Sequence, residues 1–317
     1  MRIRRERILL LILLALTLAV WGMVWRDASS GLTITVLDVG QGDSILVQAP
    51  SGRTMLVDGG GRAGEDTRGY DVGREVVTPA LMARGVRRID VLVITHPDQD
   101  HIGGLAAVLE AVPVTMALDP MLPTSSETYA ELRQQIAERK IPLHRAREGQ
   151  RINLGYGIYA DVLNPPEARL VSDAELNDNS IVLRLVDKEL SVLLAADVDE
   201  AGAERLAHMG ERIRSTILKV PHHGSANPAG TGFVQAVSPE LAVISVGARN
   251  PFGHPSQEML GELKAVGAKV MRTDEQGAVT IKLQPPRWWV WGHLRWHGMK
   301  RYSGEARTAV QPMKEAA

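Results

Sequence analysis

The sequence predicts an α/β fold, in which strands and helices alternate along a chain of 317 residues. Short apolar runs of four to seven residues recur, and such runs are typical of buried strands. Amphipathic stretches with helical spacing follow several of them. Several apolar runs also end directly in Asp or His. With 44% hydrophobic residues the chain can bury a large core, and the absence of cysteine excludes disulfides and thiolate zinc sites.

Residues 1–31 are predicted to be a membrane anchor and its linker. Arg2, Arg4, Arg5 and Arg7 precede an uncharged apolar run at residues 8–25. As a helix this run spans about 27 Å, close to the hydrocarbon thickness of a bilayer. The basic start favours a single-pass membrane protein whose remaining chain is extracytoplasmic. The alternative is a signal peptide and a secreted product, but no clear small-x-small cleavage site follows the run.

Residues 32–284 are predicted to form the main domain, which begins with three strands. The alternating segments at 32–37 and 44–48 flank the turn Asp38-Val-Gly-Gln-Gly-Asp43, and a third strand at 55–57 ends in Asp58. A helix is expected at residues 72–83, ended by Gly85.

The stretch around residues 91–104 is the centre of the predicted site. The apolar run at 91–94 is too short for a helix and reads as a buried strand. Four potential metal ligands follow it within six positions: His96, Asp98, Asp100 and His101. Gly103 and Gly104 then permit a tight turn before a helix at 105–111. Two imidazoles and two carboxylates so close together suit a pair of divalent cations.

Later strand ends carry further candidate residues. Asp197 follows the apolar strand at 190–195, and His222 and His223 follow the strand at 217–220. Adjacent side chains on an extended segment point to opposite faces, so only one of these two histidines is expected to meet a metal. A polar stretch, Asn177-Asp-Asn-Ser180, precedes the strand at 181–185.

Residues 285–317 are predicted to be a Trp/Arg-rich C-terminal tail. Its mixture of aromatic and basic residues suits a membrane interface or stacking on single-stranded nucleic acid, and a packing extension is the alternative. The net charge is −1 overall, but basic residues gather near both ends, which leaves the main domain acidic. An acidic body is not what a tight, non-specific binder of duplex DNA requires.

These segments resemble the metallo-β-lactamase fold superfamily, and within it the β-lactamase-like domain of ComEC-type competence proteins. Residues 96–101 match the pattern H-x-[HD]-x-D-H. The stretches Leu37-Asp-Val-Gly-Gln-Gly-Asp-Ser44, Pro221-His-His-Gly-Ser225 and Asn250-Pro-Phe-Gly-His-Pro255 match in the same order. The resemblance covers about residues 32–283 and implies a four-layer αββα sandwich.

The resemblance implies two divalent cations, zinc or manganese, with magnesium also suitable because one site is rich in carboxylates. Asp197 would be the bridging ligand, although Ala196 stands where the family usually has glycine. His223 is favoured as the ligand of the last motif, with the reverse assignment to His222 left open. The ligand set is His96, Asp98, Asp100, His101, Asp197 and His223.

The remaining roles also follow from the resemblance. His222 and His254 would act in catalysis, on the substrate or its leaving group. Asp58 would orient ligands without binding metal, and Asn179 and Ser180 would stand where many members have a third-motif histidine. Ordinary structural roles are the alternatives: a turn-forming Asp58, an Asp197 that caps the next helix, and a His254 that shapes a turn.

The expected function is that of a membrane-tethered, metal-dependent hydrolase, a phosphodiesterase or nuclease acting on extracytoplasmic single-stranded DNA. Two cations that share a carboxylate can activate water and clamp a phosphodiester. One alternative is hydrolysis of small phosphodiesters or other envelope esters, which the acidic main domain favours. A third possibility is a non-catalytic exported binding module with a vestigial metal site.

Overall fold

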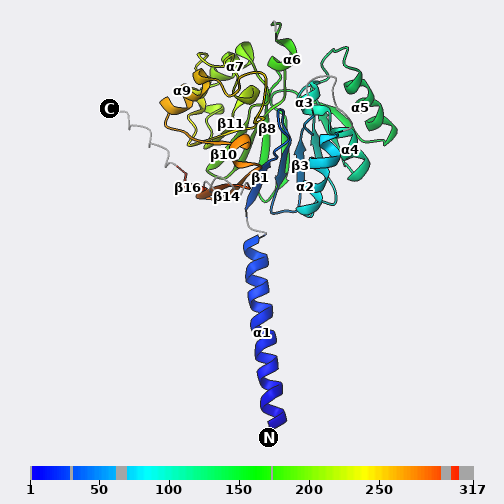
Figure 1. Cartoon of the computed structure of the whole chain (residues 1–317), viewed down its shortest axis with the longest axis vertical. Helices are drawn as coiled ribbons and strands as arrows, with labels where there is room; N and C mark the ends of the chain where they lie inside the picture. Colours follow the sequence, from blue (N-terminus) through cyan, green and yellow to red (C-terminus); the bar gives the residue numbers. More distant parts are fainter. Residues whose placement is uncertain (1, 29–30, 62–69, 173, 294–300, 307–317) are drawn as a thin grey trace, which may run out of the picture. The chain divides into compact units, whose positions relative to one another are not determined.

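The computed structural model describes residues 2–28, 31–61, 70–172, 174–293 and 301–306. It divides into two compact units, Met1–Gly31 and Leu32–Ala317. The first unit is the helix α1 (Arg2–Ala28), drawn in blue in Figure 1. In the described part of the chain, no helix is both long and apolar enough to cross a membrane.

The second unit contains two β-sheets that pack face to face (Figure 1). The first has the order β16-β15-β14-β1-β2-β3-β4-β5-β6 and the second the order β13-β12-β11-β10-β9-β8-β7. The strands of the first sheet are β1 (Leu32–Val36), β2 (Ile45–Gln48), β3 (Thr54–Val57), β4 (Val91–Val93), β5 (Ala117–Asp119), β6 (Leu143–Arg145), β14 (Val279–Gln284), β15 (Arg287–Gly292) and β16 (Arg301–Glu305). Those of the second are β7 (Arg151–Gly155), β8 (Ile158–Asn164), β9 (Val182–Asp187), β10 (Leu190–Leu194), β11 (Ile217–Lys219), β12 (Leu241–Ile244) and β13 (Lys269–Arg272).

Helices cover the outer face of each sheet. Those of the first half are η1 (Gly73–Val77), α2 (Thr78–Ala83), α3 (Gln99–Ile102), α4 (Leu105–Ala111) and α5 (Glu127–Glu138). Those of the second half are α6 (Glu175–Asp178), α7 (Glu200–Ala207), η2 (Gly210–Arg212), η3 (Pro221–Gly224), α8 (Phe233–Val237), α9 (Gln257–Ala265) and α10 (Thr273–Gln276).

Three buried apolar clusters correspond to the interfaces between the layers. The central cluster lies between the sheets, where alternate residues of β1 such as Leu32, Ile34 and Val36 meet residues of β8 to β10. A second cluster joins the first sheet to α2, α4 and α5, and a third joins the second sheet to α7, α8 and α9. The predicted αββα sandwich is therefore confirmed, because each sheet buries both of its faces.

The parallel part of each sheet sets the position of the polar loops. Strands β3 to β6 run parallel in the first sheet, and β10 to β13 run parallel in the second. Polar side chains follow β3, β4, β10 and β11 at their carboxyl ends, the place where open α/β sheets bind ligands.

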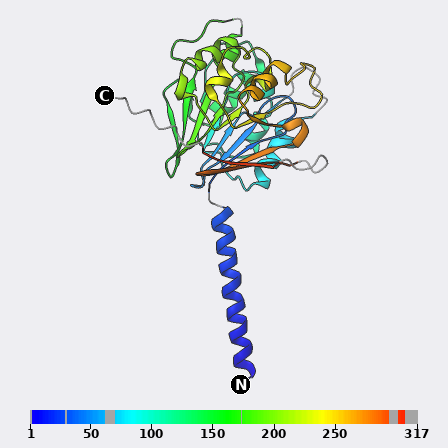
Figure 2. The same cartoon turned by 90° about the vertical axis from the view of Figure 1, so that its left-hand side faces the viewer.

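The C-terminal segment continues the first sheet beyond residue 284. β15 pairs with β14 in an antiparallel hairpin and β16 pairs with β15; Figure 2 shows these strands beside blue β1. Trp288 and Val290 alternate inward and are buried, so this part of the predicted tail packs as sheet. The rest of the predicted tail, residues 294–300 and 307–317, lies outside the described residues.

Candidate metal centre

Glycines allow two loops to pack tightly around the predicted metal-binding stretch. A Cβ atom on Gly42 would lie 2.0 Å from the Asp100 carbonyl oxygen, and one on Gly61 would lie 1.8 Å from that of Gln99. Any larger residue would push these loops away from α3. The turn after β1 and the loop after β3 therefore hold the short helix that carries Asp100 and His101.

Four predicted ligands converge at the carboxyl ends of the strands. Asp100, His101, Asp197 and His223 each place a ligand atom within 4.8 Å of the others. The Nε2 atoms of His101 and His223 both lie 3.1 Å from Oδ2 of Asp197, and His223 Nε2 lies 3.4 Å from Asp100 Oδ2. His101, Asp197 and His223 are buried, and Asp100 is half-buried.

Three imidazoles are held in the same way, from their Nδ1 side. His101 Nδ1 bonds to Asp58 Oδ2 at 2.8 Å and His223 Nδ1 to the Ser245 carbonyl at 3.0 Å. The Thr95 hydroxyl donates to Asp58, so it accepts from Nδ1–H of His96. In each ring one proton is fixed on Nδ1, so Nε2 is the atom that a metal can take in place of a second proton.

His96 and Asp98 lie beside the four-residue cluster. The rings of His96 and His101 are 4.1 Å apart, and His96 Nε2 lies 3.6 Å from Asp98 Oδ2. Asp98 is half-buried and precedes α3, the helix that carries Asp100 and His101. The predicted second ligand group is thus adjacent to the first, at the end of β4.

The donor atoms fit a bound cation. Within the described residues, buried polar atoms that lack a hydrogen-bond partner gather here: Asp43 Oδ1, His96 Nε2, His101 Nε2, Ser180 Oγ, Asp197 Oδ1 and His223 Nε2. Leaving such atoms unpaired is costly, and a divalent cation would satisfy the imidazole nitrogens and carboxylate oxygens together. Imidazole and carboxylate donors suit zinc or manganese.

The electrostatics of the cluster favour positive charge. Burial lowers the pKa of His223, but the charge of Asp197 and the hydrogen bond to Asp100 outweigh it and raise that pKa to about 9. Burial raises the pKa of Asp197, yet His101 and His223 hold it well below its usual range. The carboxylates are therefore ionised and attract cations, whether protons or metals.

Lys219 and Asp43 extend the cluster, although neither was singled out from the sequence. The buried Lys219 ammonium contacts the Asp43 carboxylate and lies 3.7 Å from Asp197 Oδ1. Its Nζ also donates to the Ala196 carbonyl at 3.2 Å. The one signal in the sequence is a lysine inside the apolar strand that leads to the two histidines.

His222 and His223 diverge for a reason that differs from the prediction. The expectation of an extended segment is wrong, because both residues adopt left-handed backbone conformations, with φ of 45° and 54°. His223 turns into the four-residue cluster, whereas His222 Nδ1 bonds to Asp199 Oδ1 at 2.8 Å. Asp199, which precedes α7, is a third residue that the sequence did not single out.

His254 lies next to His222, with 5.7 Å between the ring centres. Gln41 accepts from Gly247 N–H through Oε1, so its amide donates to His254 Nδ1, at 3.4 Å. The His254 proton therefore resides on Nε2. Burial and the nearby charges of His222 and His223 lower the pKa of His254 to about 4, which keeps this ring neutral at pH 7.

Asn179 and Ser180 differ in their surroundings. The Asn179 amide donates to the Leu170 and Glu175 carbonyls and accepts from Leu170 N–H, so it holds the loop before α6. Ser180 is fully buried, and its hydroxyl is among the unpaired atoms given above.

Comparison with known proteins matches this architecture. A model of the metallo-β-lactamase superfamily matches residues 37–247. ComE operon protein 3 of Bacillus subtilis (strain 168) is 30% identical over 267 residues, which cover 82% of this chain and 34% of that protein. Competence protein ComA of Neisseria gonorrhoeae is 33% identical over 251 residues, which cover 79% of this chain and 32% of that protein. The resemblance to ComEC-type competence proteins is thus confirmed, and the chain spans about a third of the length of these relatives.

Among solved structures, CmlA, a diiron β-hydroxylase from Streptomyces venezuelae, has a TM-score of 0.50 at 16% identity. The match covers 80% of this chain and 54% of that one. A similarity at this level of identity supports the fold alone.

Proposed function

The chain belongs to the metallo-β-lactamase superfamily, and from this we propose that it is a metal-dependent phosphodiesterase that cleaves extracytoplasmic single-stranded DNA. The observation that carries the proposal is the convergence of His101 and His223 on the Asp197 carboxylate, with His96 beside them and all three rings anchored through Nδ1. A structural polar cluster has no need to leave three Nε2 atoms unpaired.

The metal would be held by Asp100, His101, Asp197 and His223, with His96 and Asp98 completing a second position. Bound divalent cations would supply Lewis acidity to the phosphoryl group. Asp58 and the Ser245 carbonyl keep the two imidazoles of the first position in the ligating tautomer. Buried Lys219 offsets the negative charge of Asp43 and Asp197.

Two histidines beside the centre would handle protons and substrate. Asp199 fixes a proton on Nδ1 of His222 and leaves its Nε2 to act on the substrate. Gln41 fixes the proton of His254 on Nε2, so this neutral ring can donate a hydrogen bond to a phosphate oxygen or a leaving group.

The proposal of DNA as the substrate rests on the competence relatives, whose matched segment covers most of this chain.

The proposal of a membrane tether rests on the basic start of the sequence and on the helix α1. Its described apolar side chains, such as Leu10, Leu11 and Leu13, are strongly exposed. Contact with lipid would remove this apolar surface from water. Fractionation of cells tests the tether: we expect the full chain with the membranes and residues 32–317 alone in the soluble fraction.

Small phosphodiesters of the envelope are the second candidate substrates. A pocket beside Asp199 is also lined by Asp178, Glu200 and Glu204. This negative rim, close to His222, disfavours a polyanion and favours a small ester.

Cleavage assays with two variants test the function. Asp100→Ala and His101→Ala should abolish manganese- or zinc-dependent hydrolysis of single-stranded DNA, whereas His144→Ala, an exposed histidine on β6, should not. The same preparations are assayed with bis(p-nitrophenyl) phosphate and a phosphocholine ester, and hydrolysis of these alone would favour the second candidate. Unchanged activity in both variants would refute the assignment.

A further inference from the structure

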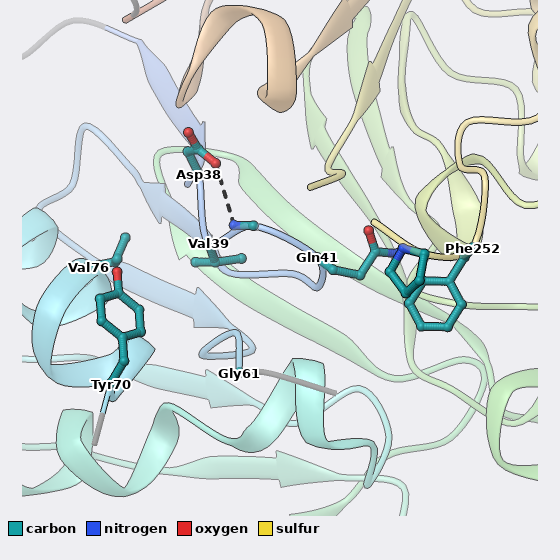
Figure 3. Close-up of a pocket in the computed structure, with 9 residues that line it drawn as sticks. Asp38, Val39, Gln41, Gly61, Tyr70, Val76 and Phe252 are labelled. Carbon is teal, nitrogen blue, oxygen red and sulfur yellow. Dashed lines mark hydrogen bonds between the residues drawn. The ribbon is translucent and has the colours of Figure 1, made fainter. Parts of the chain in front are cut away.

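A pocket of about 400 Å³ opens between the turn after β1 and the loop that precedes His254. Figure 3 shows Phe252 and Gln41 on one side of it and Tyr70 with Val76 on the other. Phe252 is 54% exposed and Tyr70 is 40% exposed. The chain has only two phenylalanines, and one of them stands at the rim of this pocket, about half exposed.

The pocket is separated from the metal centre by the backbone of Gln99 on one side and by His254 on the other. Gly61, in its wall, packs against the Gln99 backbone so closely that a Cβ atom there would lie 1.8 Å from the Gln99 oxygen. On the other side, the Phe252 ring stacks on His254, with 5.7 Å between ring centres and 29° between planes. His254 in turn lies beside His222, and His222 beside the cluster residue His223, so a series of neighbouring rings leads from Phe252 to the metal centre.

The chemistry of the lining selects against a second phosphate. Among the described residues that line the pocket there is no lysine, arginine or histidine, and the one charged group is Asp38. The Asp38 carboxylate accepts from Gly40 N–H at the pocket edge, as the dashed line in Figure 3 shows. A Cβ atom on Gly40 would meet nothing within 4 Å, so the floor beside this turn is open. The described lining therefore offers an aromatic face, Phe252, rather than a cation that would bind a second phosphate.

We propose that this pocket binds the base next to the scissile phosphodiester of a single strand, with the base stacked on Phe252. The inference rests on the proposed phosphodiesterase function and names the substrate group that it recognises. Bases stack on exposed aromatic rings with little dependence on sequence, because every base has a flat face. In a duplex the base is already stacked and paired, so the pocket selects single strands.

Binding of two labelled strands to the full-length protein, kept in detergent with EDTA to prevent cleavage, tests the proposal. One strand is oligothymidylate and the other is an abasic strand of equal length, so that only the bases differ. Fluorescence anisotropy should show tighter binding of oligothymidylate. Phe252→Ala should weaken that binding about five- to 150-fold, the range of one lost base stack, and leave the abasic strand unchanged.

Two variants serve as controls. Phe252→Tyr keeps an aromatic face and should retain the preference for oligothymidylate. Tyr156→Ala removes another exposed ring, 81% accessible, in the turn between β7 and β8. That turn packs against Ser51, which precedes the first residue of β3. Asp58, which belongs to the metal centre, follows the last residue of the same strand, so Tyr156 lies at the opposite end of β3 from the site. This variant should bind both strands like the wild type.

Equal binding of the two strands by the wild type, or equal losses for both in Phe252→Ala, would overturn the proposal. A phosphocholine ester that displaces oligothymidylate from the wild type, and does so less well from Phe252→Ala, would also overturn the proposal. It would indicate that the pocket binds a quaternary ammonium group instead of a base. The same proteins, assayed with added metal for hydrolysis of bis(p-nitrophenyl) phosphate, show whether the base subsite or the phosphodiesterase function is refuted. Activity without base preference refutes the subsite alone, and no activity with any diester refutes the proposed function.

Discussion

The Lys219 ammonium contacts the Asp43 carboxylate in the buried region beneath the metal centre. The two residues are far apart in sequence and lie on different sheets, β11 in the second and the turn before β2 in the first. This ion pair therefore joins the two halves of the sandwich directly behind Asp197, whose Oδ1 lies 3.7 Å from the same ammonium.

Removal of the buried ammonium should destabilise the fold. Lys219→Met leaves Asp43 as a buried charge without its partner, and breaking such pairs costs about 3–5 kcal/mol of unfolding free energy. The double variant with Asp43→Leu should recover much of this loss, since it removes both charges. Urea unfolding measures the free energy of unfolding of the wild type, the two single variants and the double variant. Lys264→Met, at an exposed position of α9, is the control. A loss below about 1 kcal/mol in Lys219→Met would show that the pair is not structural.

Replacement of Ala196 by glycine should stabilise the protein. Ala196 has a φ of 47°, a left-handed conformation that glycine adopts without steric cost. The family resemblance places glycine at this position, and the structure supplies the reason. We expect Ala196→Gly to raise the free energy of unfolding by up to about 1 kcal/mol, whereas Ala130→Gly within α5 should lower it by about 1 kcal/mol. Equal losses in the two variants would contradict this reading.

Divalent cations should stabilise the folded chain. A ligand that binds only the native state at a concentration one hundred times its Kd adds about 2.7 kcal/mol. Manganese or zinc should therefore raise the Tm of the wild type and of His144→Ala, and raise that of His223→Ala much less. Differential scanning fluorimetry measures the shift. A Tm increase that His223→Ala retains in full would place the cation elsewhere.

Loss of His254 should lower turnover and spare metal binding. His254 contacts Gln41, Phe252 and His222 rather than the four-residue cluster. If its Nε2–H donates to the substrate, His254→Ala should reduce kcat about 10²- to 10⁴-fold with unchanged metal content. A fall in metal content that accounts for the lost activity would instead make His254 part of the metal site.

Local sequence patterns predicted much of the fold. The helix expected at 105–111 matches α4, and the strands expected at 32–37 and 217–220 contain β1 and β11. β5 and β6 were missed because three-residue strands show no periodicity, and neither leads into a histidine motif as the equally short β4 and β11 do. The helix expected at 72–83 begins with the π-helical turn η1, which local propensity does not distinguish from an α-helix.

The candidate site was predictable where its residues are neighbours in sequence. Residues 96–101 form one local motif, so their proximity follows from the chain itself. The partnership of Lys219 with Asp43, and of His222 with Asp199, depends on how the strands pack, and a lone lysine in an apolar strand does not reveal its partner. The backbone turn at His222 and His223 was also hidden, because positive φ at residues other than glycine has no reliable signature in sequence.

Metal content measured together with cleavage tests the central claim most directly. Wild type and Asp197→Ala are purified without chelator, analysed for bound metal, and assayed on single-stranded DNA with manganese, zinc or magnesium. The account predicts about two divalent cations per wild-type chain and cleavage that Asp197→Ala abolishes, because that carboxylate meets both imidazoles. A wild-type protein that binds no metal, or an Asp197→Ala variant that cleaves at the wild-type rate, would contradict it.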